Sequence, residues 1–199
     1  MSTANKPLRF ITEFVRHPIA TAAIAPSSRH LADAMCEGID FAAVRTIFEF
    51  GPGTGVFTHA ALERLQAAAN TDFHYTALEL NPNMAAELRE RTPGADVRHA
   101  NALDLESICT QEHRPPVDLV LSGLGWPSLP GPVRDGILEQ TARVLRPGGE
   151  FRTFGYHVGL LFPGAWKFRA KCRELFSTFE ISPVIWRNLP PAFVYRCVK

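Results

Sequence analysis

The sequence predicts an α/β protein with a doubly wound, mostly parallel sheet of seven strands. Two observations support this prediction: short apolar runs alternate with helical patterns from Val44 onward, and a glycine loop follows the first run. Such alternation is typical of βαβ units, whose strands pair in parallel. We expect a single domain over 1–199, because 199 residues suffice for one core and are few for two enzyme domains.

The predicted strands are apolar runs bounded by turn residues. Five of them should form the parallel part of the sheet, over 44–50, 73–80, 95–100, 117–122 and 149–156. The runs at 179–186 and 191–198 predict an antiparallel hairpin at the C-terminus. We assign this core to 41–199 and a segment of N-terminal helices to 1–40.

Helices between these strands are marked by periodicity and by capping residues. Apolar side chains recur at helical spacing at Phe57, Ala61 and Leu65. Asn81-Pro82 supplies a capping side chain and a first-turn proline for the next helix. A later helix around Ile137 should stop at the Arg-Pro-Gly-Gly run of 146–149.

Composition excludes several classes of protein. A formal net charge of +1 gives no broad positive field, so we expect no nucleic-acid partner. The four cysteines are widely spread and form no ligand set, so we expect no metal. No apolar run is long enough for a signal peptide or a membrane span, which predicts a cytoplasmic protein without a transmembrane segment.

The strongest local signal is the loop that contains Gly51, Gly53 and Gly55, between a buried strand and an amphipathic helix. Glycines permit a tight turn and let backbone approach a ligand closely. The start of the following helix presents free N–H groups and the positive end of its dipole. The loop therefore predicts a site for an anionic or nucleotide-like ligand.

An acidic residue, Glu79, ends the second predicted strand. At that position a carboxylate can accept hydrogen bonds from two ribose hydroxyls. A solvated glutamate at a strand end is the alternative, and the neighbouring glycine loop argues against it.

The spacing of Glu49, Gly51, Gly53 and Gly55 resembles motif I of the class I methyltransferases, and differs from the G-x-G-x-x-G of nicotinamide enzymes. The resemblance implies a Rossmann-like fold and S-adenosylmethionine as the cofactor. It also implies that Glu49 orients the loop and the methionine amino group of the cofactor. Glu79, with the adjacent Leu80, would bind the ribose side of the same molecule.

Two further pairs of residues match positions of that family. Asn101-Ala102 resembles the Asp-Ala or Asp-Leu pair at the adenine edge, with an amide in place of the acid. An amide both donates and accepts hydrogen bonds, so contact with adenine is retained in principle. Ser122-Gly123 matches the motif beside the transferred methyl group, and it lacks the N-P-P-Y of nucleic acid base methylases.

A more specific resemblance covers nearly the whole chain. Four segments, over 23–35, 49–58, 122–124 and 187–196, are similar to bacterial phospholipid N-methyltransferases and their relatives that resemble ribosomal RNA adenine dimethylases. The resemblance implies methylation of phosphatidylethanolamine toward phosphatidylcholine. The partner would be a phospholipid substrate at a membrane surface, and the protein would associate peripherally with the inner face of the membrane.

Two segments could meet that membrane. Leu8, Ile11, Phe14 and Val15 fall on one helical face, which fits an interfacial helix, a lid over the cofactor, or both. The run 159–173 mixes large apolar and basic residues, and its alternative is a core helix with a solvated basic face.

The chemistry of amine methylation suggests further roles. An amine attacks only when it is unprotonated, and Tyr156 and His157, at the end of the fifth strand, are the candidates to position or accept its proton. Aromatic walls for a quaternary ammonium product are Trp126, Tyr156 and Tyr195. The lipid phosphate would bind Arg29 and Arg187.

Other functions stay open. The enzyme could act on another aminolipid, a small amine or RNA adenine, because the cofactor half does not depend on the substrate. A non-catalytic, membrane-associated regulator that binds S-adenosylmethionine is the alternative from a different class. Sequence does not determine the oligomeric state.

Overall fold

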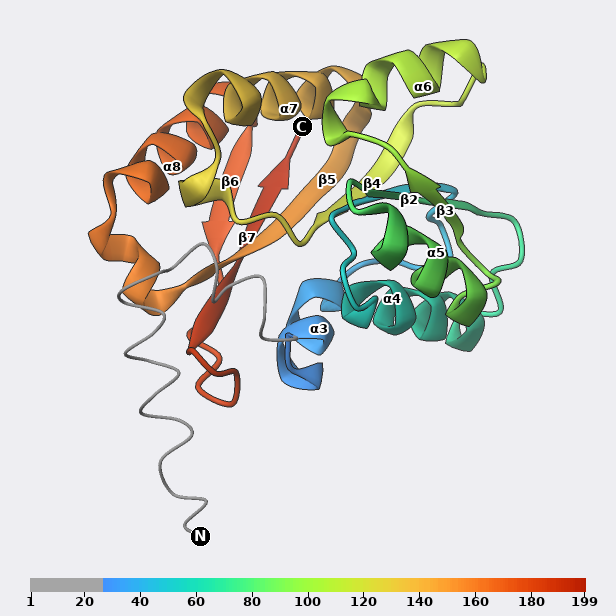
Figure 1. Ribbon diagram of the computed structural model, residues 1–199, viewed down its shortest axis with the longest axis horizontal. Coiled ribbons are helices and arrows are strands. Elements are labelled where there is room, and N and C mark those ends of the chain that lie inside the picture. The colour runs from blue at the N-terminus through green and yellow to red at the C-terminus, as the bar shows by residue number, and fades with distance from the viewer. Residues whose placement is uncertain (1–26) are drawn as a thin grey trace, which may run out of the picture.

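The computed structural model describes residues 27–199, which form one mixed sheet flanked by helices (Figure 1). Seven strands lie in the order β3-β2-β1-β4-β5-β7-β6. Neighbours from β3 to β5 pair in parallel, whereas β7 is antiparallel to both β5 and β6. The predicted fold class is therefore confirmed. The strands are β1 (Thr46–Phe50), β2 (His74–Glu79), β3 (Asp96–His99), β4 (Val117–Ser122), β5 (Leu145–Tyr156), β6 (Thr178–Ile181) and β7 (Ala192–Val198).

Helices cover both faces of the sheet. In Figure 1, α3 (Arg29–Cys36), α4 (Val56–Ala67) and α5 (Pro82–Arg91) lie on one face. The opposite face carries α6 (Leu105–Gln111), α7 (Gly131–Val144) and α8 (Pro163–Leu175). Three short 3-10 turns complete the connections: η2 (Ala102–Asp104), η3 (Trp126–Ser128) and η4 (His157–Leu161).

Each face of the sheet has its own apolar core, because successive residues of a strand point to opposite sides. In β1, Ile47 packs into the core under α3 and α4, while Phe48 packs into the core on the other side. Every residue of β1 is buried, as expected for a central parallel strand covered on both faces.

The helix signals in the sequence have a direct structural basis. The Asn81 side chain accepts hydrogen bonds from the backbone N–H groups of Asn83 and Met84, and Pro82 occupies the first turn of α5. Phe57, Ala61 and Leu65 are buried on one face of α4, as their spacing predicts.

Two strands differ from their predicted bounds by more than two residues at one end. β5 begins at Leu145, directly after α7, because the Arg-Pro-Gly-Gly run continues as strand through a register irregularity opposite Val117 and Leu119. At Gly149 a Cβ would lie 3.0 Å from the Val117 carbonyl oxygen, so glycine lets β5 pass close to β4. β6 ends at Ile181 because Pro183 has no N–H to donate, and only Ile185 forms a further bridge, to Ala192.

The predicted N-terminal amphipathic helix, with Leu8, Ile11, Phe14 and Val15, lies outside the described residues. Part of the predicted helical segment is described: α3 begins at Arg29, with Ser28 as its cap. Within residues 27–199, no helix is both long and apolar enough to cross a membrane.

Candidate functional site

The carboxyl ends of β1, β2 and β4 lie together at one edge of the sheet, which is the edge where open α/β sheets bind ligands. The glycine loop after β1 lies at this edge. Gly51, Gly53 and Gly55 have φ of +58°, +56° and +81°, in the left-handed region that side chains rarely adopt. Gly55 caps α4 and accepts a backbone hydrogen bond of 2.9 Å from His59. The loop therefore requires glycine and presents bare backbone.

The loop after β4 packs directly against the glycine loop. The N–H of Gly123 donates to the Phe50 carbonyl at 2.8 Å. A Cβ at Gly123 would overlap the carbonyl oxygen of Gly51, and a Cβ at Gly51 would press on Leu124. Gly123 is thus required by close contact between two backbones.

Glu79 lies at the end of β2, beside the glycine loop. Its carboxylate accepts hydrogen bonds from the backbone N–H groups of Gly53, at 3.1 Å, and Asn81, at 2.9 Å. The side chain is largely buried against the loop. Glu79 therefore connects β2 to the middle of the glycine loop, beside which the sequence predicts a ribose.

Glu49 is completely buried beneath the loop. Thr58 and Tyr75 donate hydroxyl hydrogen bonds to one carboxylate oxygen, Oε2, at 2.6 and 2.7 Å. The other oxygen, Oε1, has no hydrogen-bond partner among the described residues. Burial raises the pKa of Glu49 to about 7, against the lowering effect of the two hydroxyl donors.

The glycine cradle and this buried, unpartnered oxygen fit S-adenosylmethionine. A cofactor that carries a positively charged amino group would supply the hydrogen bond that Oε1 lacks. The bare backbone would meet the rest of the amino acid portion, because the three glycines carry no Cβ.

The predicted adenine edge is formed by η2 and the end of β2. Asn101 caps η2, since its side-chain oxygen accepts from the N–H of Leu103 at 3.0 Å. In return, the Asp104 carboxylate accepts from the N–H of Asn101 at 3.2 Å. Ala102 begins this turn and is partly buried. Leu80 directly follows β2, is exposed and offers an apolar surface.

The loop after β4 is fixed by buried polar contacts. The Ser122 hydroxyl accepts from the N–H of Leu124 at 3.2 Å, and its carbonyl accepts from Thr153 Oγ1 at 3.0 Å. Trp126 donates from Nε1 to the same Thr153 oxygen at 2.9 Å. The Trp126 ring is only 1% exposed and packs on Phe168, so most of it belongs to the core.

The three predicted aromatic walls meet at one small apolar cavity of about 20 Å³, at the end of β5. Trp126, Tyr156 and Tyr195 all line it, together with Gly155 of β5. This volume is about that of one water-sized probe, so a head group enters only if the walls move. Burial raises the pKa of Tyr156, which keeps its phenol neutral.

The remaining predicted residues are dispersed along the same edge. His157 is exposed, with its ring 6.0 Å from that of Trp186. Arg29 is paired with Glu63 at 2.5 Å and Asp33 at 3.4 Å, so its charge is already neutralised. Arg187 is exposed and forms no ion pair with the described residues.

Sequence reasoning missed Asn188, which connects two of the segments that carry the family resemblance, 23–35 and 187–196. This buried amide accepts from the N–H of Ser28 at 2.9 Å and donates to the Pro190 carbonyl at 2.7 Å. The start of α3 is therefore held against the loop between β6 and β7. The signal was present, because both residues fall in the segments 23–35 and 187–196.

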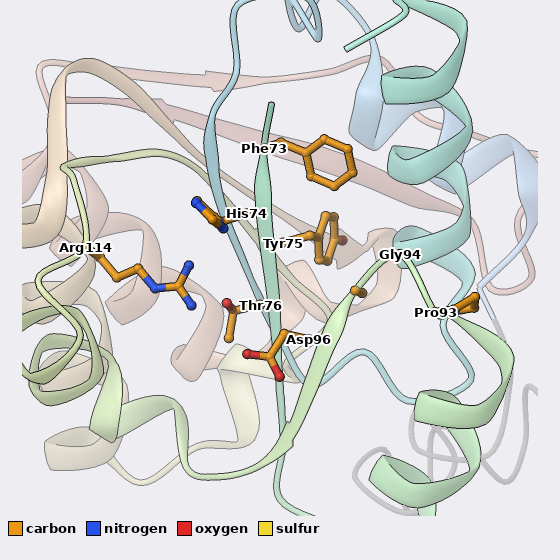
Figure 2. Close-up of a pocket in the computed structure, with 9 residues that line it drawn as sticks. Phe73, His74, Tyr75, Thr76, Pro93, Gly94, Asp96 and Arg114 are labelled. Atoms are coloured by element: carbon orange, nitrogen blue, oxygen red, sulfur yellow. The ribbon is translucent and has the colours of Figure 1, made fainter. Parts of the chain in front are cut away.

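A larger pocket of about 280 Å³ lies at the opposite edge of the sheet (Figure 2). Its lining includes His74 and Asp96, the first residues of β2 and β3, and the side chain of Arg114. It is therefore remote from the carboxyl ends of these strands and from the glycine loop. Within the described part of the chain, no cluster of three metal-ligating side chains is present.

Comparisons with known proteins agree with this geometry. The model of a family described as a methyltransferase domain matches residues 48–151. An ornithine lipid N-methyltransferase of Singulisphaera acidiphila is 32% identical over 193 residues, which cover 94% of this chain and 93% of the relative.

Solved structures share the fold at low sequence identity. A spermidine synthase bound to a transition-state analogue has a TM-score of 0.67 at 11% identity, over 87% of this chain. A 16S rRNA N2 G1207 methyltransferase of T. thermophilus, in complex with AdoMet and guanosine, has a TM-score of 0.59 at 18% identity, over 85% of this chain. The chain spans only 61% and 42% of the lengths of these two proteins.

The fold, the glycine loop and the two carboxylates beneath it define a class I methyltransferase whose cofactor is S-adenosylmethionine. Within that class, the chain belongs to the methyltransferase domain family.

Proposed function

We propose that this protein transfers a methyl group from S-adenosylmethionine to the amino head group of a membrane lipid. The observation that carries the proposal is the relative named for ornithine lipid N-methylation, which aligns over nearly the full length of both chains. Phosphatidylethanolamine, methylated toward phosphatidylcholine, is the substrate that the four motif segments favour. Ornithine lipid is the alternative that the relative favours. Both substrates present a primary amine near an anionic group.

Cofactor binding is assigned to one set of residues. The backbone from Gly51 to Gly55 would hold the amino acid portion, with Glu49 behind it. Glu79 and Leu80 would meet the ribose, and Asn101-Ala102 the adenine. The positive end of α4 and the bare loop support this assignment. When bound, the cofactor supplies an activated methyl group, and Ser122-Gly123 would lie beside it.

The protein must then position an unprotonated amine. In-line transfer needs the nucleophile about 3 Å from the methyl carbon, so positioning contributes most of the catalysis. We assign this role to Tyr156, because it lines the small cavity at the end of β5 and its phenol is neutral and able to form hydrogen bonds with the amine. His157 is exposed and would pass the proton to solvent.

The substrate end combines aromatic and basic groups. Tyr156 and Tyr195 border the small cavity and would surround a methylated ammonium through cation–π attraction. Trp126 would contribute only the edge that reaches this cavity, because the rest of its ring is buried. Arg187, exposed beside Trp186, remains available to a lipid phosphate, whereas Arg29 would first have to leave Glu63 and Asp33.

Peripheral contact with the inner face of the membrane is part of the proposal. Large apolar side chains are exposed at the edge of the sheet where β5 ends: Leu161 is 85% exposed, Trp166 67% and Trp186 72%. Lys167 and Arg187 are adjacent in sequence to the two tryptophans and would attract anionic lipid. The second half of α8 packs its Phe168 and Cys172 into the core, so we place the contact at η4 and the start of α8.

The proposal is tested by incubating the purified protein with methyl-labelled S-adenosylmethionine and liposomes that contain either phosphatidylethanolamine or ornithine lipid. We expect labelled lipid from at least one liposome type. Calorimetry of cofactor binding serves as the control. Normal cofactor binding without any labelled lipid would contradict the lipid assignment and favour a small amine, RNA adenine or a regulatory role.

A further inference from the structure

Arg169 is an arginine in an unusual environment. Every described arginine except Arg89, Arg169, Arg173 and Arg187 forms an ion pair with a carboxylate. Arg89 donates to a backbone carbonyl, and Arg173 and Arg187 are exposed to water. Arg169 alone of these is partly buried against aromatic rings and has no carbonyl or carboxylate acceptor among residues 27–199.

The contacts of Arg169 orient its guanidinium but do not neutralise it. Its Nε donates to the Tyr195 hydroxyl at 2.7 Å. The guanidinium carbon lies 5.2 Å from the Tyr195 ring centroid and 5.5 Å from that of Phe193. A guanidinium stays charged and carries five donors, of which these contacts use one. A partly desolvated charge of this kind is stabilised by an anion that accepts from the remaining donors.

Arg169 also lies next to the place where the amine must arrive. Tyr195, which accepts its hydrogen bond, lines the small cavity at the end of β5 together with Gly155 and Tyr156. Phe193, under the guanidinium, pairs with Gly155 in the sheet. A positive charge and the proposed methyl acceptor site are therefore separated by one aromatic side chain.

We infer that Arg169 binds the oxyanion of a zwitterionic aminolipid head group and thereby directs the amine toward Tyr156. This inference rests on the proposed lipid N-methylation. The ligand chemistry is a phosphodiester or a carboxylate adjacent to an amine, because both anions match the planar fork of a guanidinium. The site is distinct from Arg29, whose two carboxylate partners already occupy it.

The test is a kinetic comparison of Arg169→Gln with Arg173→Gln. Arg173 is the matched control, since it lies one turn further along α8, also stacks on an aromatic ring, Phe179, and lies outside the proposed site. In micelles of phosphatidylethanolamine and, separately, of ornithine lipid, we expect R169Q to raise KM about tenfold or more and to leave kcat nearly unchanged. Cofactor affinity should not change in either variant.

Four results decide the question. A raised KM for one lipid only supports the inference and assigns the site to that oxyanion. A KM for R169Q equal to that of R173Q with both lipids overturns it. Arg169→Lys, which keeps the charge but loses the fork, should lie between wild type and R169Q. A wild-type protein that methylates neither lipid would instead refute the proposed function, and the inference with it.

A measurement on the unaltered protein covers the case in which R169Q does not fold. Glycerophosphoethanolamine carries both the amine and the oxyanion, whereas ethanolamine carries the amine alone. We expect the first to inhibit lipid methylation competitively at a concentration at least about tenfold lower than the second. Equal inhibition by the two compounds would overturn the role of Arg169.

Discussion

The two halves of the carboxyl edge are built differently. Between β1 and β2, the proposed cofactor half is held by backbone and carboxylate hydrogen bonds, such as those of Glu79 to Gly53 and Asn81. The proposed substrate half is an apolar cavity of about 20 Å³, lined by aromatic and apolar residues of η3, β5, α8 and β7. On this proposal the first half is preformed, whereas the second must open to admit a head group. Rigid hydrogen bonding suits a cofactor common to many enzymes, and side-chain packing suits a substrate particular to one.

The largest expected effect comes from Gly123→Ala, which tests whether the cofactor half is rigid. A Cβ there would overlap the Gly51 carbonyl oxygen, and two backbone segments would have to separate. We expect a loss of stability of about 3 kcal/mol and severe loss of cofactor binding. Thermal unfolding and calorimetry measure both. Gly125→Ala is the control, since nothing lies within 4 Å of its Cβ, and it should behave like wild type.

The buried Glu49 predicts a pH dependence. Its pKa in the folded protein, about 7, exceeds its ordinary value of 4.5, so the folded state binds a proton more tightly than the unfolded state. Stability is therefore greatest below pH 4.5 as far as this group is concerned, and it falls as pH rises from 4.5 to 7. The decrease amounts to about 3 kcal/mol at most.

Glu49→Gln should remove this decrease, because an amide oxygen still accepts from Thr58 and Tyr75 but does not ionise. Urea unfolding at several pH values across this window would measure the difference in slope. Glu90→Gln, at an exposed position on α5, should keep the wild-type slope. An unchanged slope in Glu49→Gln would show that Glu49 does not titrate in this range.

Glu79→Gln tests the proposed contact between the Glu79 carboxylate and the ribose of the cofactor. The amide keeps one acceptor oxygen but loses the charge, so we expect cofactor affinity to fall by about tenfold to a hundredfold. Calorimetry with S-adenosylmethionine measures the change, and Glu90→Gln again serves as control. Full affinity in the variant would place the ribose elsewhere.

The smallest expected effect concerns the contact between α3 and the β6–β7 loop. Asn188→Ala removes the acceptor of the Ser28 N–H and the donor to Pro190, and leaves both backbone groups without these partners. We expect a loss of about 2 kcal/mol in unfolding free energy. Asn83→Ala, at an exposed position, should cost much less. Equal losses in the two variants would show that the Asn188 bridge contributes little.

The sequence predicted the cofactor half more fully than the substrate half, for a physical reason. Positive φ at Gly51, Gly53 and Gly55 excludes most other residues, so this backbone geometry can be recognised in the sequence as glycine. Alternating strands and helices likewise revealed the sheet. No comparable signal exists for Trp126 and Arg29. Whether a tryptophan is buried, or an arginine is paired, depends on residues far away in the chain, such as Thr153 and Glu63.

The contact between Gly123 and the Gly51 carbonyl makes the two loops a single mechanical unit, since neither can shift without displacing the other. If head-group entry moves the loop after β4, it must change the fit of the loop that cradles the cofactor. Binding of either ligand then alters the affinity for the other by the same factor, as thermodynamic reciprocity requires. Coupled binding of cofactor and lipid would follow from the close contact between these two backbone segments.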